Sequence, residues 1–390
     1  MYQISRGCQE DFEQIRDFAN YVFSQSDGPH DFKQLLPKIY EDGRNSAEYH
    51  YLIREDGNIR AMACVIPGMI EAAGRQLKTG CIGTVSVHPY SRGRGYMKIL
   101  MDKVTRELRQ DGYDLAFLEG QRQRYEYFGF EPSGMQLIYT LTDANIRHAS
   151  DRAGAAAADI LLLPLEQGDK WTEAAFELYQ QQKVRVIRDK KDFAAILKSW
   201  SAIPCTILYQ GVFAGYLTLQ PEGRINELVL KENKILALLL KPLLSLAGTD
   251  RLFIAAALYE TERNELLSGI AEACSLQSCH NYSIFDWKKV IYAFLKLKSE
   301  YAGLAEGTLV IGIGDETIRI TVSGDYSITL EETAEKADIQ LSSPEAVTVL
   351  LSPAGITAGS SCMKSLNNSQ RLCFQTWFPL PLYTAVTDCC

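Results

Sequence analysis

GTVSVHPYSRGRGYMKIL, residues 83–100, joins an apolar strand to an amphipathic helix through a turn rich in glycine and arginine. Such a turn points backbone N–H groups of the helix N-terminus into one concave space, where the helix dipole adds roughly half a positive charge. Glycines let a ligand approach the main chain closely, and arginines add charge-assisted hydrogen bonds. The stretch therefore predicts a site for a diphosphate, centred on Arg92, Gly93, Arg94 and Gly95.

This stretch fits neither of two common phosphate-binding motifs. Its glycines lack the G-x-G-x-x-G spacing, and the lysine of a Walker A motif is missing. The tight-turn signals at Asp56-Gly57 and Ala73-Gly74 predict antiparallel hairpins before it, whereas a Rossmann unit needs parallel strands. Short glycine motifs also recur by chance, so an arginine-capped solvated turn is the simpler alternative. The strand before the turn and the helix after it favour the binding site.

The elements around the turn predict an α/β domain. Apolar residues at helical spacing indicate a helix over Gln9–Gln25, and the hairpin signals follow it. A helix over Met97–Leu108 and a short buried strand at Leu115–Leu118 complete this N-terminal domain, which we place at residues 1–145.

Two further domains are predicted. After an alanine-rich connector at residues 151–158 the same order of elements recurs, which predicts a second copy of the fold over residues 146–285 that lacks the glycine-arginine turn. Strands with period-two alternation and apolar helices predict a small α+β domain over residues 286–390, with a docked tail from Cys373 to Cys390. The fold class is therefore α/β and α+β, with mixed, mostly antiparallel central sheets.

Composition excludes several classes of function. The chain has 390 residues, of which 46% are hydrophobic and 23% charged, as in folded multidomain proteins. Its formal charge of −8 argues against nucleic acid or anionic membrane as a partner. We find no apolar run long enough for a membrane span and no signal peptide in Met1–Gln14, so we expect a cytoplasmic protein. The ten cysteines form no C-x-x-C and the five histidines no i, i+4 pair, which predicts no metal site.

Arg92–Met97 resembles the pyrophosphate-binding motif of GNAT-type acetyltransferases, Arg/Gln-x-x-Gly-x-Gly/Ala, except that Met97 replaces the last small residue. The segment RYEYFGF at residues 124–130, a second GNAT-like domain and a C-terminal unit similar to sterol carrier protein 2 extend the resemblance to the enhanced intracellular survival family. The resemblance implies two tandem GNAT-like domains followed by a sterol-carrier-like domain. It also implies acetyl-CoA as co-substrate and a homo-oligomer, which is a hexamer in the best-known relatives.

The resemblance also assigns the residues that would bind acetyl-CoA and protonate its sulfur. Tyr125 matches the family's proton donor, and Tyr127 is its rival on the same short helix. The acetyl-CoA residues would be Val85, Ser86, Val87, Arg92, Gly93, Arg94, Gly95, Tyr96, Met97, Lys98, Gly120 and Gln121.

The residue that accepts the proton of the amine is assigned last. Many GNAT enzymes carry a glutamate on the strand before the motif, but residues 81–85 hold no carboxylate. In the family that this chain resembles, the base is the terminal carboxylate, here that of Cys390. Glu119, Glu126 and Asp388 are the alternatives.

Two functions remain open at this stage. The first is an acetyl-CoA-dependent N-acetyltransferase acting on a small-molecule or lysine-type amine, such as an aminoglycoside or polyamine, by direct attack on the thioester. The second is a non-catalytic scaffold that binds acyl-CoA or lipid. Release of the CoA thiol in the presence of an amine distinguishes them.

Overall fold

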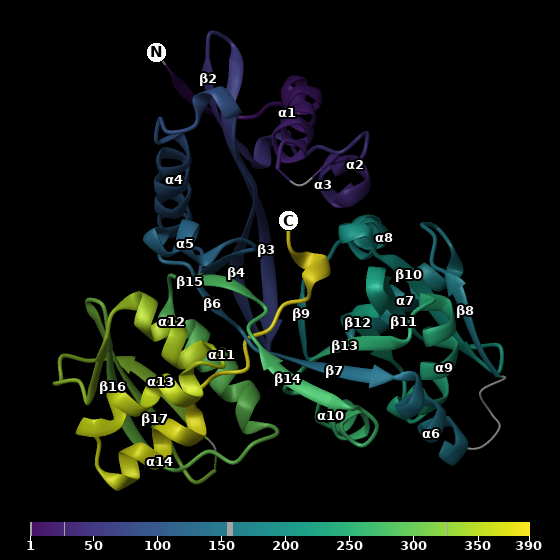
Figure 1. Ribbon diagram of the computed structural model, residues 1–390. Coiled ribbons are helices and arrows are strands. Elements are labelled where there is room, and N and C mark those ends of the chain that lie inside the picture. The colour runs from purple at the N-terminus through teal and green to yellow at the C-terminus, as the bar shows by residue number, and fades with distance from the viewer. Residues whose placement is uncertain (1, 27, 154–158, 326) are drawn as a thin grey trace.

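A computed structural model describes residues 2–26, 28–153, 159–325 and 327–390. Three sheets with flanking helices make up the molecule (Figure 1). The mixed α/β character predicted from sequence is confirmed. Residues 154–158, which form most of the alanine-rich connector, lie outside the described residues.

The first sheet carries the glycine-arginine turn. Its strands run in the order β1-β2-β3-β4-β5-β15-β6, and β9 pairs with β3. The bounds are β1 (Gln3–Arg6), β2 (His50–Glu55), β3 (Asn58–Ala72), β4 (Arg75–Val87), β5 (Leu115–Leu118), β6 (Glu131–Ser133), β9 (Val184–Val186) and β15 (His280–Ile284). Asp56-Gly57 and Ala73-Gly74 take positive φ angles and form the two predicted hairpin turns.

Helices cover both faces of this sheet. Side chains alternate along β3, so Met62 and Cys64 join the core beneath α1 (Phe12–Ser24), whereas Ala61 and Ala63 join the core beneath α4 (Tyr96–Gln110). Three short helices complete the unit: α2 (Phe32–Leu35), α3 (Pro37–Tyr40) and α5 (Arg122–Tyr125).

The second sheet repeats the plan of the first. Its order is β14-β7-β13-β12-β11-β10-β8, and β12 runs parallel to β13 as β4 runs parallel to β5. The strands are β7 (Gln136–Thr142), β8 (Ile160–Pro164), β10 (Ile203–Tyr209), β11 (Val212–Gln220), β12 (Arg224–Leu230), β13 (Arg251–Ala257) and β14 (Ala273–Gln277). The helices are α6 (Asp143–Ala153), α7 (Lys170–Gln180), α8 (Phe193–Leu197), α9 (Leu236–Ala247) and α10 (Thr261–Ser268). As predicted, no glycine occurs in residues 231–235, which link β12 to α9.

The two sheets exchange strands. β7 follows β6 in the chain but pairs with β13 and β14, and β15 returns to the first sheet between β5 and β6. The boundaries expected near residues 145 and 285 therefore each fall just after a strand that has crossed to the other sheet. Sequence patterns reveal that a segment is extended, but they do not reveal which sheet edge it joins.

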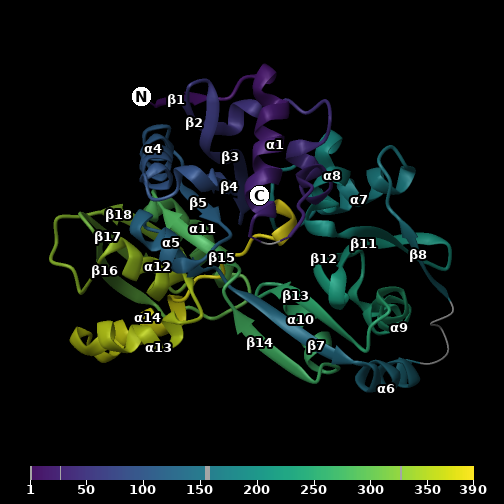
Figure 2. The same ribbon diagram turned by 45° about the horizontal axis from the view of Figure 1, so that its top comes forward.

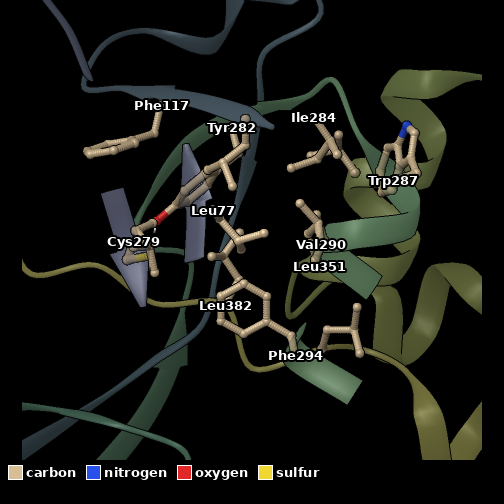
Figure 3. Close-up of a cluster of buried hydrophobic side chains, with 14 of the residues drawn as sticks. Leu77, Phe117, Cys279, Tyr282, Ile284, Trp287, Val290, Phe294, Leu351 and Leu382 are labelled. Atoms are coloured by element: carbon tan, nitrogen blue, oxygen red, sulfur yellow. Dashed lines mark hydrogen bonds between the residues drawn. The ribbon is translucent and has the colours of Figure 1, made fainter. Parts of the chain in front are cut away.

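The third unit is a four-stranded sheet covered by helices. Its strand order is β18-β17-β16-β19, formed by β16 (Gly307–Ile313), β17 (Glu316–Val322), β18 (Ile328–Glu332) and β19 (Ile339–Leu341). The helices are α11 (Trp287–Ser299), α12 (Ser343–Leu351), α13 (Gly355–Cys362) and α14 (Asn368–Trp377). Leu77 and Phe117 of the first sheet share one buried cluster with Trp287, Val290 and Leu351 (Figure 3), so the first and third units have a common core.

The helices are short compared with the thickness of a membrane. Among the described residues, no single helix is long and apolar enough to cross a bilayer. Ser343–Leu351 and Gly355–Ser365 together meet the length and composition criteria, but they are bent by 94° at the break between them.

The tail is docked along its length. Leu380 N donates to Leu350 O at 2.8 Å, and Leu382 O accepts from Met135 N at 2.7 Å. The tail, yellow in Figures 1 and 2, then runs to a C-terminus that lies near β4 and α8. It thereby touches all three units, and its last residues end at the first sheet.

Candidate active site

β4 is distorted where the sequence placed the ligand site. Its ladder with β3 shifts register between Met62 and Cys64, and Thr84 takes a φ of 44°. The parallel ladder with β5 ends at Ile82, while the ladder with β3 continues to Val87. Residues Val85–Val87 therefore turn one edge of their backbone away from the sheet, where it can hydrogen-bond to a ligand.

The turn after β4 forms one wall of a groove. Gly93 and Gly95 have φ angles of 78° and 76°, a region that glycine enters without strain. Gly95 is the N-cap of α4 and has no side chain to satisfy the first N–H groups of the helix, which suits an anion. The groove is lined by Val87, Ser91, Arg92, Gly93, Gly95, Tyr96, Met97, Lys98, Arg124, Tyr127 and Phe128.

The two arginines of the turn have different surroundings. Arg94 forms a two-pronged ion pair with Glu55 of β2, with both N–O distances 2.6 Å, and Tyr96 donates to the same carboxylate at 2.8 Å. Arg94 lowers the pKa of Glu55, as expected for a paired carboxylate. Both arginines are exposed, but Arg92, unlike Arg94, lines the groove. Arg94 thus ties the turn to β2, and Arg92 is the arginine that faces the groove.

Tyr125 and Tyr127 also differ in environment. The Tyr125 side chain is 8% exposed and packs on Gly120, where an added Cβ would lie 2.4 Å from the Tyr125 ring. Burial raises the pKa of Tyr125, so the phenol keeps its proton at neutral pH. Tyr127 is 81% exposed at the rim of the groove. Gly120 itself is held by Asn281, whose Nδ2 donates to its carbonyl at 2.9 Å, and Gln121 is exposed.

The C-terminus lies against the distorted part of β4. A Cβ on Gly83 would lie 2.3 Å from the carbonyl carbon of Cys390, so only glycine fits at position 83. Cys390 N donates to Cys81 Sγ at 3.2 Å, and the two Sγ atoms are 3.1 Å apart. Burial raises the pKa of the Cys390 thiol, and it is the main cause of the raised pKa of Cys81. The terminal carboxyl group is thus placed beside Gly83 and the bulge.

Buried polar contacts hold the last residues in place. Arg188 binds Glu227 at 2.8 Å and Asp388 at 2.8 Å, and both ion pairs are almost completely buried. Lys38 Nζ donates to the carbonyls of Thr387 at 2.6 Å and Cys389 at 2.5 Å. Removing one partner of a buried ion pair would leave the other charge buried and unpaired, which is strongly destabilising. This network therefore fixes the position of the tail.

Each alternative base predicted from sequence has a charged partner. Asp388 belongs to the Arg188 network. Glu126 lies 3.2 Å from Arg122, and Glu119 lies 2.6 Å from His280.

Sequence reasoning missed His280. β5 and β15 are antiparallel neighbours, and the pairing of Leu118 with Asn281 sets His280 opposite Glu119. The Nδ1 atom of His280 is 2.6 Å from Glu119, and its Nε2 atom is 3.1 Å from Thr384 O. Burial alone would lower the pKa of His280, but Cys389 and Glu119 raise it to about 10. Because the contact depends on the strand exchange, no local signal in the sequence could have revealed it.

A second buried histidine supports the bulge. The Tyr40 hydroxyl lies 2.9 Å from both His50 Nε2 and Thr84 Oγ1, and His50 Nδ1 is 3.0 Å from Ser46 O. Burial lowers the pKa of His50 to about 4, so the ring is neutral near pH 7.

The state of His50 predicts a pH dependence of stability. Its folded pKa of about 4 lies below the ordinary 6.5, so the unfolded chain binds a proton first as the pH falls. The contribution of neutral His50 to the free energy of unfolding is fully present above pH 6.5. It is lost as the pH falls toward 4, and a pKa shift of this size corresponds to about 3 kcal/mol. Urea unfolding at pH 7 and pH 4.5 measures the free energy of unfolding. Between these two pH values the unmodified chain should lose more of it than His50→Asn does. The exposed His148→Asn is the matched control, and an equal slope in all three chains would contradict this role.

The N-terminal part of the chain is similar to a known domain family. Residues 3–133 match the family model described as the acetyltransferase (GNAT) domain. No curated protein matches the chain.

Several solved structures share the fold across the chain. An Enterococcus faecalis protein of unknown function, described as a probable N-acyltransferase, is 16% identical with a TM-score of 0.69, covering 98% of each chain. A GCN5-related N-acetyltransferase from Anabaena variabilis is 14% identical with a TM-score of 0.69, covering 99% of this chain and 98% of that one. Eis1 from Mycobacterium abscessus is 15% identical with a TM-score of 0.66, with the same coverage.

Proposed function

We propose that this chain is an acetyl-CoA-dependent N-acetyltransferase that acts on an amine. The observation that carries the proposal is the position of the Cys390 carboxyl group beside the bulge of β4, on a strand that also leads into the groove. The match of residues 3–133 to the GNAT domain supports it. In this proposal the Cys390 carboxylate is the base, Tyr125 is the proton donor, and the turn before α4 is the anion-binding site.

The residues of the groove fit acetyl-CoA, which supplies the acetyl thioester. The backbone edge of Val85–Val87 would hydrogen-bond to the pantetheine arm, and the N-terminus of α4 would bind the pyrophosphate with Arg92. Gly93 and Gly95 would let the phosphates approach the main chain. Gly120 and Gln121 would lie on the far side of the arm.

Two groups would move the protons of the reaction. The Cys390 carboxylate would accept the proton of the amine as its nitrogen attacks the acetyl carbonyl, directly or through a water. Tyr125, which burial keeps protonated, would donate its proton to the departing sulfur. A new C–N bond then replaces the C–S bond, and the products are an acetylated amine and the CoA thiol.

The acceptor is an aminoglycoside, a polyamine or a lysine-type amine. Aromatic rings gather at the end of α1 and after it. Phe23 meets Phe32 edge to face, and His30 is tilted against both rings. Phe32 contacts Tyr40 at 5.4 Å between ring centroids. Tyr40 in turn contacts the bulge through Thr84. Aromatic faces attract ammonium groups, which supports an amine at this position.

Arg92→Ala should raise the KM for acetyl-CoA roughly 3- to 10-fold, because an exposed charge-assisted contact to phosphate is partly screened by solvent. Arg94→Ala should raise it less, because this side chain is already paired with Glu55. Steady-state kinetics at saturating amine measures both effects, with Arg224→Ala in the second unit as control. An unchanged KM in Arg92→Ala would remove the pyrophosphate assignment.

A panel of amines tests the function itself. Thiol release from acetyl-CoA is measured with aminoglycosides, polyamines and lysine peptides, and acetylation is confirmed by mass spectrometry. Turnover with at least one class is expected. Binding of acetyl-CoA without thiol release for any amine would favour the second candidate, a non-catalytic acyl-CoA or lipid-binding scaffold.

The sterol-carrier-like nature of the third unit, the homo-oligomeric state and the cytoplasmic location stay predictions. Size-exclusion chromatography with light scattering would measure the oligomeric state, for which we propose a hexamer.

A further inference from the structure

Three metal-ligating side chains meet next to the C-terminus, in a cluster that sequence spacing did not predict. One ligand atom of each of Glu119, His280 and Cys389 lies within 4.8 Å of the other two. They come from the end of β5, the start of β15 and the tail. A carboxylate oxygen, an imidazole nitrogen and a thiolate sulfur form a donor set that Zn²⁺ accepts.

The surrounding structure holds the His280 ring and the backbone of Cys389 in place. The His280 ring contacts the rings of Phe117 and Tyr282 in tilted arrangements, with centroid distances of 5.5 Å and 5.9 Å. The carbonyl of Cys389 accepts from Lys38 Nζ at 2.5 Å and from Trp200 Nε1 at 3.2 Å. Little conformational freedom would therefore be lost when a cation binds.

The hydrogen bonds of His280 select which nitrogen would bind a cation. Its Nε2 atom faces the carbonyl oxygen of Thr384 at 3.1 Å, which can only accept a hydrogen bond. Metal-binding histidines commonly donate their second N–H to such a carbonyl. Nδ1 would then be the nitrogen that binds the cation, in place of its present contact with Glu119 at 2.6 Å.

The charge of the site would stay balanced. With a proton on each ring nitrogen, both of which face acceptors, His280 would carry one positive charge that balances the Glu119 carboxylate beside a neutral Cys389 thiol. Loss of one proton from Nδ1 and one from Cys389 Sγ, with gain of one divalent cation, leaves the sum at zero. A buried site accepts such an exchange because no net charge is transferred into it.

We propose that Glu119, His280 and Cys389 form a binding site for a divalent cation of the zinc type. Three protein ligands leave a fourth position for water, as in open zinc sites. The Glu119 side chain is 45% exposed and gives the cation a route from solvent. The test of this site does not depend on the proposed acetyl transfer, since cation binding is measured without turnover.

Calorimetry on the full chain tests the site. The protein is stripped with a chelator under reducing conditions and titrated with ZnCl₂ in two buffers of different ionisation enthalpy. We expect one tight site with release of about two protons, because thiol and imidazolium must both lose a proton. Co²⁺ in place of Zn²⁺ should show the near-ultraviolet charge-transfer band of a thiolate ligand.

Variants locate the site. Cys389→Ser should abolish the cobalt band, and Glu119→Gln should weaken zinc binding by at least about 10-fold. Cys279→Ser is the matched control, because Cys279 is the buried neighbour of His280 but contacts Tyr282 instead of this cluster. Cys274→Ser controls for an exposed thiol.

The outcomes separate clearly. The proposal is overturned if Cys389→Ser keeps the zinc affinity and the cobalt band of the unmodified chain. It is also overturned if these are lost in Cys274→Ser instead, or if the unmodified chain has no tight zinc site. If Cys389→Ser does not fold, zinc and cobalt binding to the unmodified chain and to Glu119→Gln test the proposal instead. A cobalt spectrum without a thiolate band, or binding unaffected by Glu119→Gln, would then contradict the assignment.

Discussion

One glycine added after Cys390 should lower kcat by at least about 100-fold, as expected for loss of a general base. The added peptide bond converts the carboxylate into an amide, which cannot accept the proton of the amine. The position of Cys390 against Gly83 also leaves little room for an extra residue at that point. Steady-state thiol release measures kcat, and calorimetry with acetyl-CoA measures whether the groove still binds.

Two comparisons make this result specific. A glycine inserted after Gly168, in a surface turn of the second unit, changes chain length without touching the site. Cys390→Ala keeps the terminal carboxylate, so it should cost far less turnover than the extension. Full activity of the extended chain would move the base to Glu119, Glu126 or Asp388.

Tyr125→Phe should lower kcat by about 100-fold or more while the affinity for acetyl-CoA stays near normal, because only the proton donor is removed. The ring still packs on Gly120, so the fold should persist. Tyr127→Phe is the matched control on the same segment, since that side chain is 81% exposed. A large loss of kcat in Tyr127→Phe with little change in Tyr125→Phe would instead identify Tyr127 as the proton donor.

The second unit has a structural link to the site although it lacks the glycine-arginine turn. Arg188 and Glu227 belong to it, and with Asp388 and Thr387 they form a buried network at the end of the tail. The Arg188 guanidinium keeps the pKa of Glu227 below its usual value in spite of burial. The second copy of the fold thus helps to hold the terminal carboxyl group at the first sheet.

Local features were predictable from sequence. The turns at Asp56-Gly57 and Ala73-Gly74 depend on residues that enter positive φ, and the structure confirms both. The strand over Leu115–Leu118 is confirmed at its predicted bounds. In each case the information lies within a few adjacent residues.

Non-local features were not predictable. The contact of Arg94 with phosphate stays a prediction, whereas its ion pair with Glu55, 39 residues away in the chain, was not predicted. The pairing of His280 with Glu119 spans 161 residues and requires β15 to cross into the first sheet. Hydrophobic periodicity records which face of a strand is buried and carries no information about such partners.

The measurement that tests the central claim most directly replaces the terminal carboxylate by a carboxamide of the same size. A semisynthetic chain that ends in the α-carboxamide of Cys390 is compared with the identically ligated chain that ends in the carboxylate. Near-ultraviolet circular dichroism and acetyl-CoA affinity check that the two chains fold and bind alike. We predict that the carboxamide chain loses at least about 100-fold in kcat. Equal turnover of the two chains would show that the terminal carboxylate is not the base.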